Sequence, residues 1–124
     1  MSVLVVDDSV FLLKSACEFL KKIGFSKFIA VDSGEKALQA IRDHHKEIQF
    51  VWLDWNMPHP NGQEVLKQIK ENDEWKHLPV FFVTTESNKA HIIAAIKMGA
   101  TDYITKPIKP STLYPKLKRF LEHH

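Results

Sequence analysis

Disulfide-forming pairs are absent from this sequence, which contains only Cys17 among its 124 residues. A single cysteine excludes an internal disulfide, and such a chain suits a reducing cytoplasm. Long hydrophobic runs are missing too, since no apolar stretch approaches the ~20 residues of a membrane-spanning helix. No basic segment precedes the apolar run at 3–6, and acidic residues follow it at once, unlike a signal peptide. These absences favour a cytoplasmic protein without membrane insertion.

A strong charge of either sign is also lacking, because the formal net charge is only +2. A balance this even gives no indication of a surface for nucleic acid or for anionic membranes. The composition, 44% hydrophobic and 26% charged, is ordinary for one globular domain. A chain of this size hides roughly two-thirds of its unfolded surface, enough for one core. We predict one domain at 1–120, with 121–124 the start of a vector-encoded polyhistidine tag.

What the sequence does contain is a regular alternation of short apolar runs with longer segments of helical period. The run at 3–6 is continuous and rich in β-branched residues, as expected for a strand buried on both faces of a parallel sheet. Ser9 and Gly24 are placed to begin and end the first helix. Further strands are predicted at 28–31, 50–53, 80–83 and 103–104. Five strands alternating with five helices predict an α/β fold with a doubly wound parallel sheet and helices on both faces.

Polar residues of interest lie where these predicted strands end. In doubly wound sheets, ligands bind beyond the carboxyl ends of the strands, where the strand order reverses. Asp7 and Asp8 follow the first strand, and Asp54 follows the third. Thr84 ends the fourth strand, and Lys106 comes just after the fifth. We therefore expect these side chains to converge on one crevice.

The predicted crevice has a clear chemical consequence. Carboxylates that share a crevice repel, because two unit charges ~4 Å apart cost about 4 kcal/mol at an effective dielectric constant near 20. Either some carboxyls stay protonated or a cation lies among them, and hard oxygen ligands with an open, hydrated remainder favour Mg²⁺. A carboxylate beside Mg²⁺ and a lysine is a suitable nucleophile toward phosphorus. The crevice therefore predicts phosphoryl transfer onto an aspartate.

Each residue taken alone also has a structural interpretation. An aspartate before a helix, such as Asp7 or Asp8, is about as often an N-cap as a ligand. An aspartate before a turn, such as Asp54, is more often a turn residue than a nucleophile. Thr84 is by default a strand former and Lys106 a solvated loop lysine. The joint placement of these residues at one end of the sheet is what favours a functional site.

Four sequence blocks carry a resemblance to a known family: VLVVDDS at 3–9, LDWNMP at 53–58, VTTE at 83–86 and GATDYITKP at 99–107. On these blocks the chain resembles the receiver domain of two-component response regulators over nearly its whole length. The resemblance implies a flavodoxin-like sheet of strand order 2-1-3-4-5, for which chemotaxis receivers are a standard example. It also implies a phosphoacceptor switch that assists its own phosphorylation and dephosphorylation, rather than an enzyme.

The resemblance assigns the acidic residues by position. Asp54 would accept a phosphoryl group from a histidine kinase. Mg²⁺ would be bound by Asp8, by Asp54 and by the backbone carbonyl of Asn56, with Asp7 assisting. The sequence therefore implies Mg²⁺ as the cofactor and a histidine kinase as the phosphodonor.

Further positions would belong to the switch and to its lifetime. Lys106 would pair with the phosphoryl group, and the peptide bond after it would be cis. Thr84 and Tyr103 would form the pair of residues that responds to phosphorylation. The positions that tune dephosphorylation are occupied by Asn56 and Glu86.

The resemblance is strongest to the stand-alone chemotaxis subgroup, whose members bind the flagellar motor through the fourth helix, fifth strand and fifth helix. Four residues match its contact positions by type: Lys89, Ile92, Tyr103 and Lys116. The flagellar motor switch is thus the expected output partner, and the family admits a phosphatase as a further one. Pro115 departs from the pattern, since a proline inside a helix removes a backbone donor and costs ~3 kcal/mol. We expect the last helix to start late or to kink.

Two alternatives stay open. The chain could be a receiver domain cut from a larger hybrid kinase or transcriptional regulator. It could also be an aspartate-nucleophile phosphatase, although that family needs a second aspartate where Asn56 stands and a cap domain over the substrate. A degenerate receiver is disfavoured because every required side chain is present.

Overall fold

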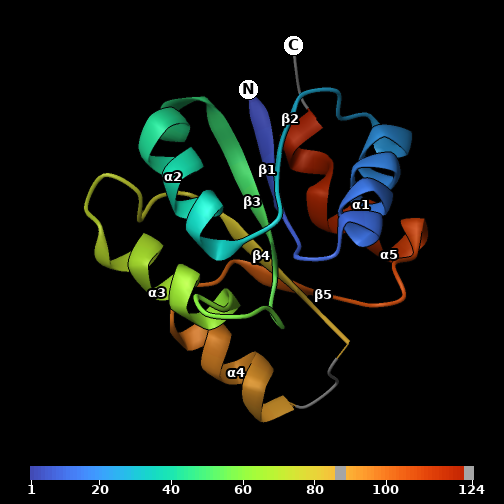
Figure 1. Ribbon diagram of the computed structural model, residues 1–124. Helices are drawn as coiled ribbons and strands as arrows, with labels where there is room; N and C mark the ends of the chain where they lie inside the picture. The colour runs from blue at the N-terminus through green and yellow to red at the C-terminus, as the bar shows by residue number, and fades with distance from the viewer. Residues whose placement is uncertain (86–88, 122–124) are drawn as a thin grey trace.

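A parallel sheet of five strands forms the centre of the molecule, in the order β2-β1-β3-β4-β5 (Figure 1). The computed structural model describes residues 1–85 and 89–121. The predicted strand order is confirmed, and each predicted apolar run lies within a strand. The strands are β1 (Ser2–Val6), β2 (Phe28–Val31), β3 (Ile48–Asp54), β4 (Val80–Thr84) and β5 (Asp102–Thr105).

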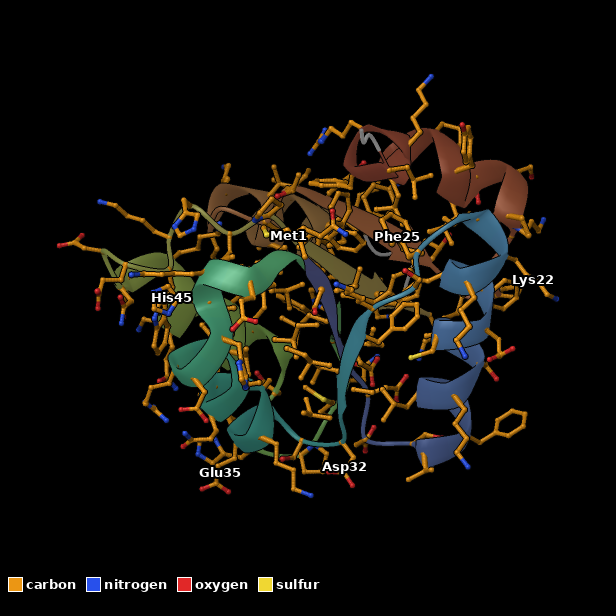
Figure 2. The ribbon with its side chains drawn as sticks, turned by 90° about the horizontal axis from the view of Figure 1, so that it is seen from above. Met1, Lys22, Phe25, Asp32, Glu35 and His45 are labelled. Atoms are coloured by element: carbon orange, nitrogen blue, oxygen red, sulfur yellow. The ribbon has the colours of Figure 1, made fainter. Side chains whose placement is uncertain are left out.

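Helices cover both faces of the sheet, with α1 and α5 on one face and α2, α3 and α4 on the other (Figure 1). Seen from above, side chains fill the space between the sheet and the helices (Figure 2). The helices are α1 (Val10–Ile23), α2 (Gly34–His44), α3 (Gly62–Glu71), α4 (Lys89–Lys97) and α5 (Pro110–Leu117), and two 3₁₀ turns are η1 (His45–Glu47) and η2 (Lys118–Leu121).

Successive residues of the central strands face the two helical layers in turn. Val3 and Val5 pack with α1 and α5, whereas Leu4 and Val6 pack with α2 and α3. Because side chains alternate along a strand, a strand covered on both faces must be apolar at every position. This double burial explains the continuous run at 3–6 and brings the carboxyl ends of β1 and β3 side by side.

Local signals set both ends of α1 as predicted. The Ser9 hydroxyl accepts a hydrogen bond from the backbone N–H of Leu12 at 3.2 Å and so caps α1. Gly24 ends the same helix with a φ of 123°, and Gly99 follows α4 with a φ of 109°. Both angles lie in the left-handed region that favours glycine over other residues.

The last helix departs from its prediction. α5 begins at Pro110, well before Pro115, so the expected late start is wrong. Proline is tolerated in the first helical turn, where its missing N–H would have no helical acceptor, and Pro110 therefore opens the helix. The α-helix then includes Pro115 and changes to the 3₁₀ turn η2 at Lys118. Across the described residues, no helix has both the length and the apolar character needed to cross a membrane.

Candidate functional site

The carboxyl ends of β1 and β3 bring the predicted acidic residues together. Asp7, Asp8 and Asp54 each place a carboxylate oxygen within 4.8 Å of the other two. Asp7 and Asp54 are buried, whereas Asp8 is exposed. Thr84 ends the neighbouring strand β4 and is buried as well. This oxygen-only cluster fits the ligands that Mg²⁺ prefers.

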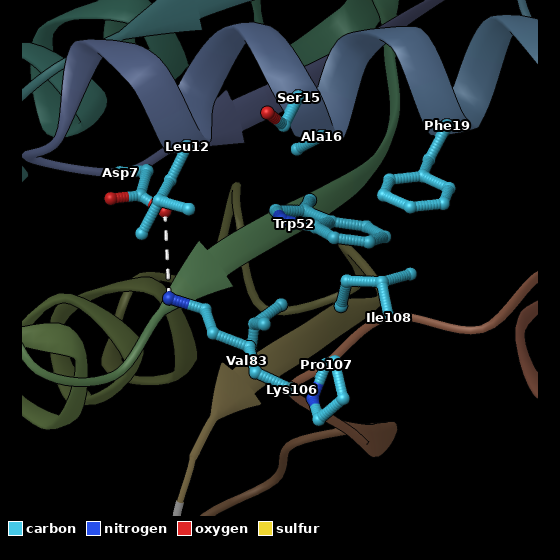
Figure 3. Close-up of a pocket in the computed structure, with 10 residues that line it drawn as sticks. All are labelled: Asp7, Leu12, Ser15, Ala16, Phe19, Trp52, Val83, Lys106, Pro107 and Ile108. Atoms are coloured by element: carbon cyan, nitrogen blue, oxygen red, sulfur yellow. Dashed lines mark ion pairs between the residues drawn. The ribbon is translucent and has the colours of Figure 1, made fainter.

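Lys106 reaches into this cluster from the end of β5. Its Nζ lies 3.4 Å from Oδ1 of Asp54 and 3.7 Å from Oδ2 of Asp7 (Figure 3 shows the pair with Asp7). Its backbone N–H donates to the carbonyl of Thr84 at 2.9 Å, which fixes the end of β5 against β4. The peptide bond to Pro107 is cis, as predicted. One ammonium thus faces two buried carboxylates.

The electrostatics of the cluster are set mainly by the burial of Asp54. Burial and the neighbouring charge of Asp7 raise the pKa of Asp54 to about 6, while the ammonium of Lys106 opposes the rise. Keeping Asp54 ionised therefore costs the folded state free energy, and the charge of Lys106 offsets only part of that cost. A cation bound among these oxygens would offset that cost, so the residues present fit a divalent metal.

Asp7 and Asp8 differ in their surroundings. Oδ1 of Asp7 accepts the backbone N–H of Ser9 at 3.0 Å, and Oδ2 faces Lys106. The N-cap of α1 is therefore Ser9 and not Asp7, which instead shapes the turn before the helix. Asp8 is exposed beside it and is better placed to meet a hydrated ion.

The loop between β3 and α3 carries Asn56, whose side chain is exposed. The backbone N–H of Trp55 donates to the carbonyl of Val83 at 2.9 Å, and the N–H of Gly62 donates to the carbonyl of Trp55 at 3.2 Å. At the far end of the loop, Asn61 and Glu64 cap α3 with a reciprocal pair of hydrogen bonds. The loop is therefore held at both ends.

Thr84 and Tyr103 lie on neighbouring strands and face the same side of the sheet. Tyr103 pairs with Phe82 in the register of β4 and β5, so it is a diagonal neighbour of Thr84. Its ring is half-buried, with its centroid 6.2 Å from that of Phe82. The ammonium of Lys116 lies 4.2 Å from the centroid of the tyrosine ring.

The positions predicted to contact an output partner are not equally exposed. Lys89 is exposed at the start of α4, whereas Ile92 is half-buried against the core. Lys116 also pairs with Asp102 at 3.5 Å and donates to the backbone carbonyl of Tyr103. Asp102 was not predicted, because its pairing depends on how α5 packs over β5 and leaves no sequence signal. The predicted tuning residue Glu86 lies outside the described residues.

A cavity of about 260 Å³ lies beside Lys106, between α1 and the segment after β5 (Figure 3). Its walls are mostly apolar and include Leu12, Phe19, Trp52 and Ile108. The Asp7–Lys106 pair forms its polar end. The lysine stem therefore crosses from an apolar cavity to the acidic cluster, as long basic side chains commonly do.

Comparison with known proteins agrees with the geometry. The sequence profile of the response regulator receiver domain matches residues 3–118, and the chain belongs to this family. Family members are phosphoacceptor switches that bind Mg²⁺ at an acidic pocket and interact with histidine kinases and downstream targets. Because the chain belongs to the receiver family, this assignment takes the place of the alternative that it is an aspartate-nucleophile phosphatase.

The relatives include chemotaxis proteins of similar length. The chain is 36% identical over 122 residues to chemotaxis protein CheY-3 of Vibrio cholerae, covering 98% of this chain and 92% of the relative. It is 33% identical over 118 residues to chemotaxis protein CheY1 of Helicobacter pylori, covering 95% and 94%.

Solved structures show the same fold. The CheY–CheX complex of Borrelia burgdorferi with BeF₃ and Mg²⁺ matches with a TM-score of 0.85 at 26% identity, covering 98% of this chain and 90% of that one. Chemotaxis protein CheY4 of Vibrio cholerae matches with a TM-score of 0.84 at 28% identity, covering 95% and 96%.

Proposed function

We propose that this protein is a cytoplasmic response regulator of the chemotaxis type, with a receiver domain at 1–120 that is phosphorylated on Asp54 by a histidine kinase. The observation that carries the proposal is the position of Lys106, whose Nζ lies 3.4 Å from Asp54 and 3.7 Å from Asp7 within an acidic cluster. A cation beside a buried carboxylate is what phosphoryl transfer requires, because the incoming group is anionic.

In the proposed reaction, a carboxylate oxygen of Asp54 attacks the phosphorus of a phosphohistidine. The P–O bond to Asp54 forms as the P–N bond breaks, and the imidazole nitrogen leaves with the electron pair. With its pKa at about 6, Asp54 is mostly ionised at neutral pH and therefore competent as a nucleophile. Lys106 pairs with a phosphoryl oxygen as the group arrives.

The metal site is proposed to consist of Asp8, Asp54 and the backbone carbonyl of Asn56, with Asp7 assisting. Bound Mg²⁺ would offset negative charge on the transferred phosphoryl oxygens. Asp7 contributes chiefly by holding Lys106 and the turn before α1, since both its oxygens have protein partners. Asn56 and Glu86 are proposed to tune the rate of dephosphorylation.

The switch is proposed to run from Thr84 to Tyr103. A hydrogen bond from the Thr84 hydroxyl to a charged phosphoryl oxygen is worth about 1.5–3 kcal/mol, which shifts a two-state equilibrium by roughly 10- to 150-fold. The space that Thr84 leaves lets the half-buried ring of Tyr103 turn further inward. That movement changes the surface formed by Lys89, Ile92, Tyr103 and Lys116, which is proposed to bind an output protein, here the flagellar motor switch.

The fluorescence of Trp55, next to the proposed acceptor, tests this function. Mg²⁺ is titrated into the wild-type protein and into Asp54→Asn, and beryllofluoride or acetyl phosphate is then added. We expect a saturable response to Mg²⁺, followed by a second change that only the wild type shows. A wild-type protein that responds to neither addition would contradict the proposal. A crystal structure of the beryllofluoride form with Thr84 and Tyr103 unmoved would contradict the switch alone.

A further inference from the structure

The segment between β3 and α3, residues 55–61, lies between the first residues of two helices, and both of those residues are glycines. Gly34 begins α2 and Gly62 begins α3. Neither has the positive φ of Gly24 and Gly99, so their backbones are accessible to any residue. The reason for glycine at these two positions must therefore be space rather than conformational freedom.

A Cβ atom at position 62 would press on the acceptor strand itself. It would lie 2.6 Å from the carbonyl oxygen of Asp54 and 2.7 Å from the Cα of Trp55. Both distances are below van der Waals contact, and both neighbours are backbone atoms that have no rotamer to change. The start of α3 thus touches the acceptor residue directly.

A Cβ atom at position 34 would press on the same segment from the other side. It would overlap the carbonyl oxygen of Pro60 and lie 2.9 Å from both Cγ of Pro60 and Cγ2 of Val65. Gly34 is the first residue of α2, a helix that supplies none of the proposed site residues. Its neighbour Pro60 nonetheless belongs to the segment that carries Asn56 and lies near the end of that segment, next to Asn61.

When two packed parts collide, the less firmly held one moves. α2 is anchored by Ala37 and Ile41, which have no exposed surface. In the segment 55–61, by contrast, Asn56, Pro58 and His59 are exposed and the other residues are only partly buried. An added side chain at position 34 would meet the segment at Pro60 and the buried Val65 of α3, and of these two neighbours the segment is the less tightly packed.

We infer that Gly34 is a positioning residue for the metal site: its missing side chain lets the β3–α3 segment close against α2 and so sets where the backbone carbonyl of Asn56 lies. The inference rests on the proposed Mg²⁺ site. Groups that orient metal ligands from outside the ligand shell typically change metal affinity by about 10- to 100-fold when altered.

The test compares Gly34→Ala with Gly99→Ala, which makes the same chemical change after α4. A Cβ at position 99 would lie nearest the side chain of Lys70, 3.0 Å from its Cγ, and the φ of 109° makes alanine there unfavourable as well. Both variants should lose thermal stability. Only Gly34→Ala should weaken Mg²⁺ binding, measured by Trp55 fluorescence and by calorimetry, by about 10- to 100-fold.

Two further outcomes are decisive. Wild-type Mg²⁺ affinity in Gly34→Ala would overturn the inference while leaving the proposed function intact, whereas a wild-type protein that binds no Mg²⁺ would overturn both.

If Gly34→Ala does not fold, nuclear magnetic resonance of the wild-type protein tests the inference instead. Saturation with Mg²⁺ should shift the amide resonance of Gly34 and leave that of Arg42, at the other end of α2, in place. A Gly34 amide that Mg²⁺ does not move would overturn the inference.

Discussion

At the scale of single residues, the site is a balance between the burial of Asp54 and the charge of Lys106. Burial and the neighbouring charge of Asp7 raise the pKa of Asp54, and the ammonium of Lys106 lowers it again toward its ordinary value. The value of about 6 leaves the group ionised under physiological conditions but at a cost to the folded state. Two substitutions separate these contributions.

The first substitution is Asp54→Asn in the absence of metal. Because the folded pKa of about 6 lies above the unfolded value of 3.8, the folded state binds the proton more tightly. Wild-type stability should therefore fall as pH rises from about 4 to 6, whereas the neutral amide has no such penalty. We expect Asp54→Asn to be more stable by about 2–3 kcal/mol above pH 6 and to lose this advantage below pH 4. Urea unfolding across this range, with exposed Asp73→Asn as control, measures the difference. Equal pH dependence in Asp54→Asn and wild type would contradict the assigned pKa.

The second substitution is Lys106→Met, with Lys109→Met, an exposed lysine, as its control. Removing the ammonium beside Asp54 should raise the pKa of Asp54 further, which carboxyl nuclear magnetic resonance detects. It should also slow phosphorylation by acetyl phosphate about 10²-fold, the usual cost of losing one group that stabilises transition-state charge. Phosphorylation of Lys106→Met at the rate of Lys109→Met would exclude a direct role for Lys106.

At the scale of the elements, the structure shows why local signals were informative for some helices and misleading for the last one. Ser9 and Gly24 act through hydrogen bonds and backbone angles that involve only their own helix, so the ends of α1 were predictable. Pro115 was expected to delay or to kink α5, but the helix begins at Pro110 and includes the proline, with Leu113 and Leu117 buried on either side of it. Tertiary packing therefore overrode a local preference.

Replacing Pro115 measures the free-energy cost of a proline inside the helix, which that packing offsets. In Pro115→Ala, the new N–H restores the helical donor for the carbonyl of Ser111, so the free energy of unfolding should rise by about 1–3 kcal/mol. Pro110→Ala is the matched control, because proline in the first helical turn removes no helical hydrogen bond and should change stability little. Thermal unfolding of both variants gives the comparison. A Pro115→Ala protein no more stable than Pro110→Ala would show that α5 is already relaxed around its proline.

At the scale of the whole molecule, the site joins the two helical layers to the sheet. Asp54 and Asp7 end central strands, Lys106 enters from the edge strand, and α2 and α3 enclose the intervening segment. A ligand that holds these parts together must stabilise the entire fold, since it binds the folded state and has no site in the unfolded chain.

Mg²⁺ should therefore raise the melting temperature. At a free concentration 100 times its dissociation constant, the gain is about 2.7 kcal/mol. Asp8→Asn should lose most of this gain, whereas Asp32→Asn, whose carboxylate pairs with Lys36 on the surface, should retain it. Calorimetric scans with and without Mg²⁺ test the expectation. An equal Mg²⁺ effect in Asp8→Asn and wild type would remove Asp8 from the ligand set.

The sequence by itself determined the alternation of strands and helices, and with it the end of the sheet where the polar residues gather. That much follows from periodicity and chain order, because apolar spacing is a local property and parallel strands must all end on one side. Resemblance to known receivers supplied the strand order and the roles of single residues. The tertiary structure alone decided three things: that Asp7 divides its oxygens between Ser9 and Lys106, that Asp102 pairs with Lys116, and that Gly34 lies against Pro60. These are contacts between residues distant in sequence or set by the exact turn of the backbone, and they depend on how whole elements pack rather than on any pattern along the chain.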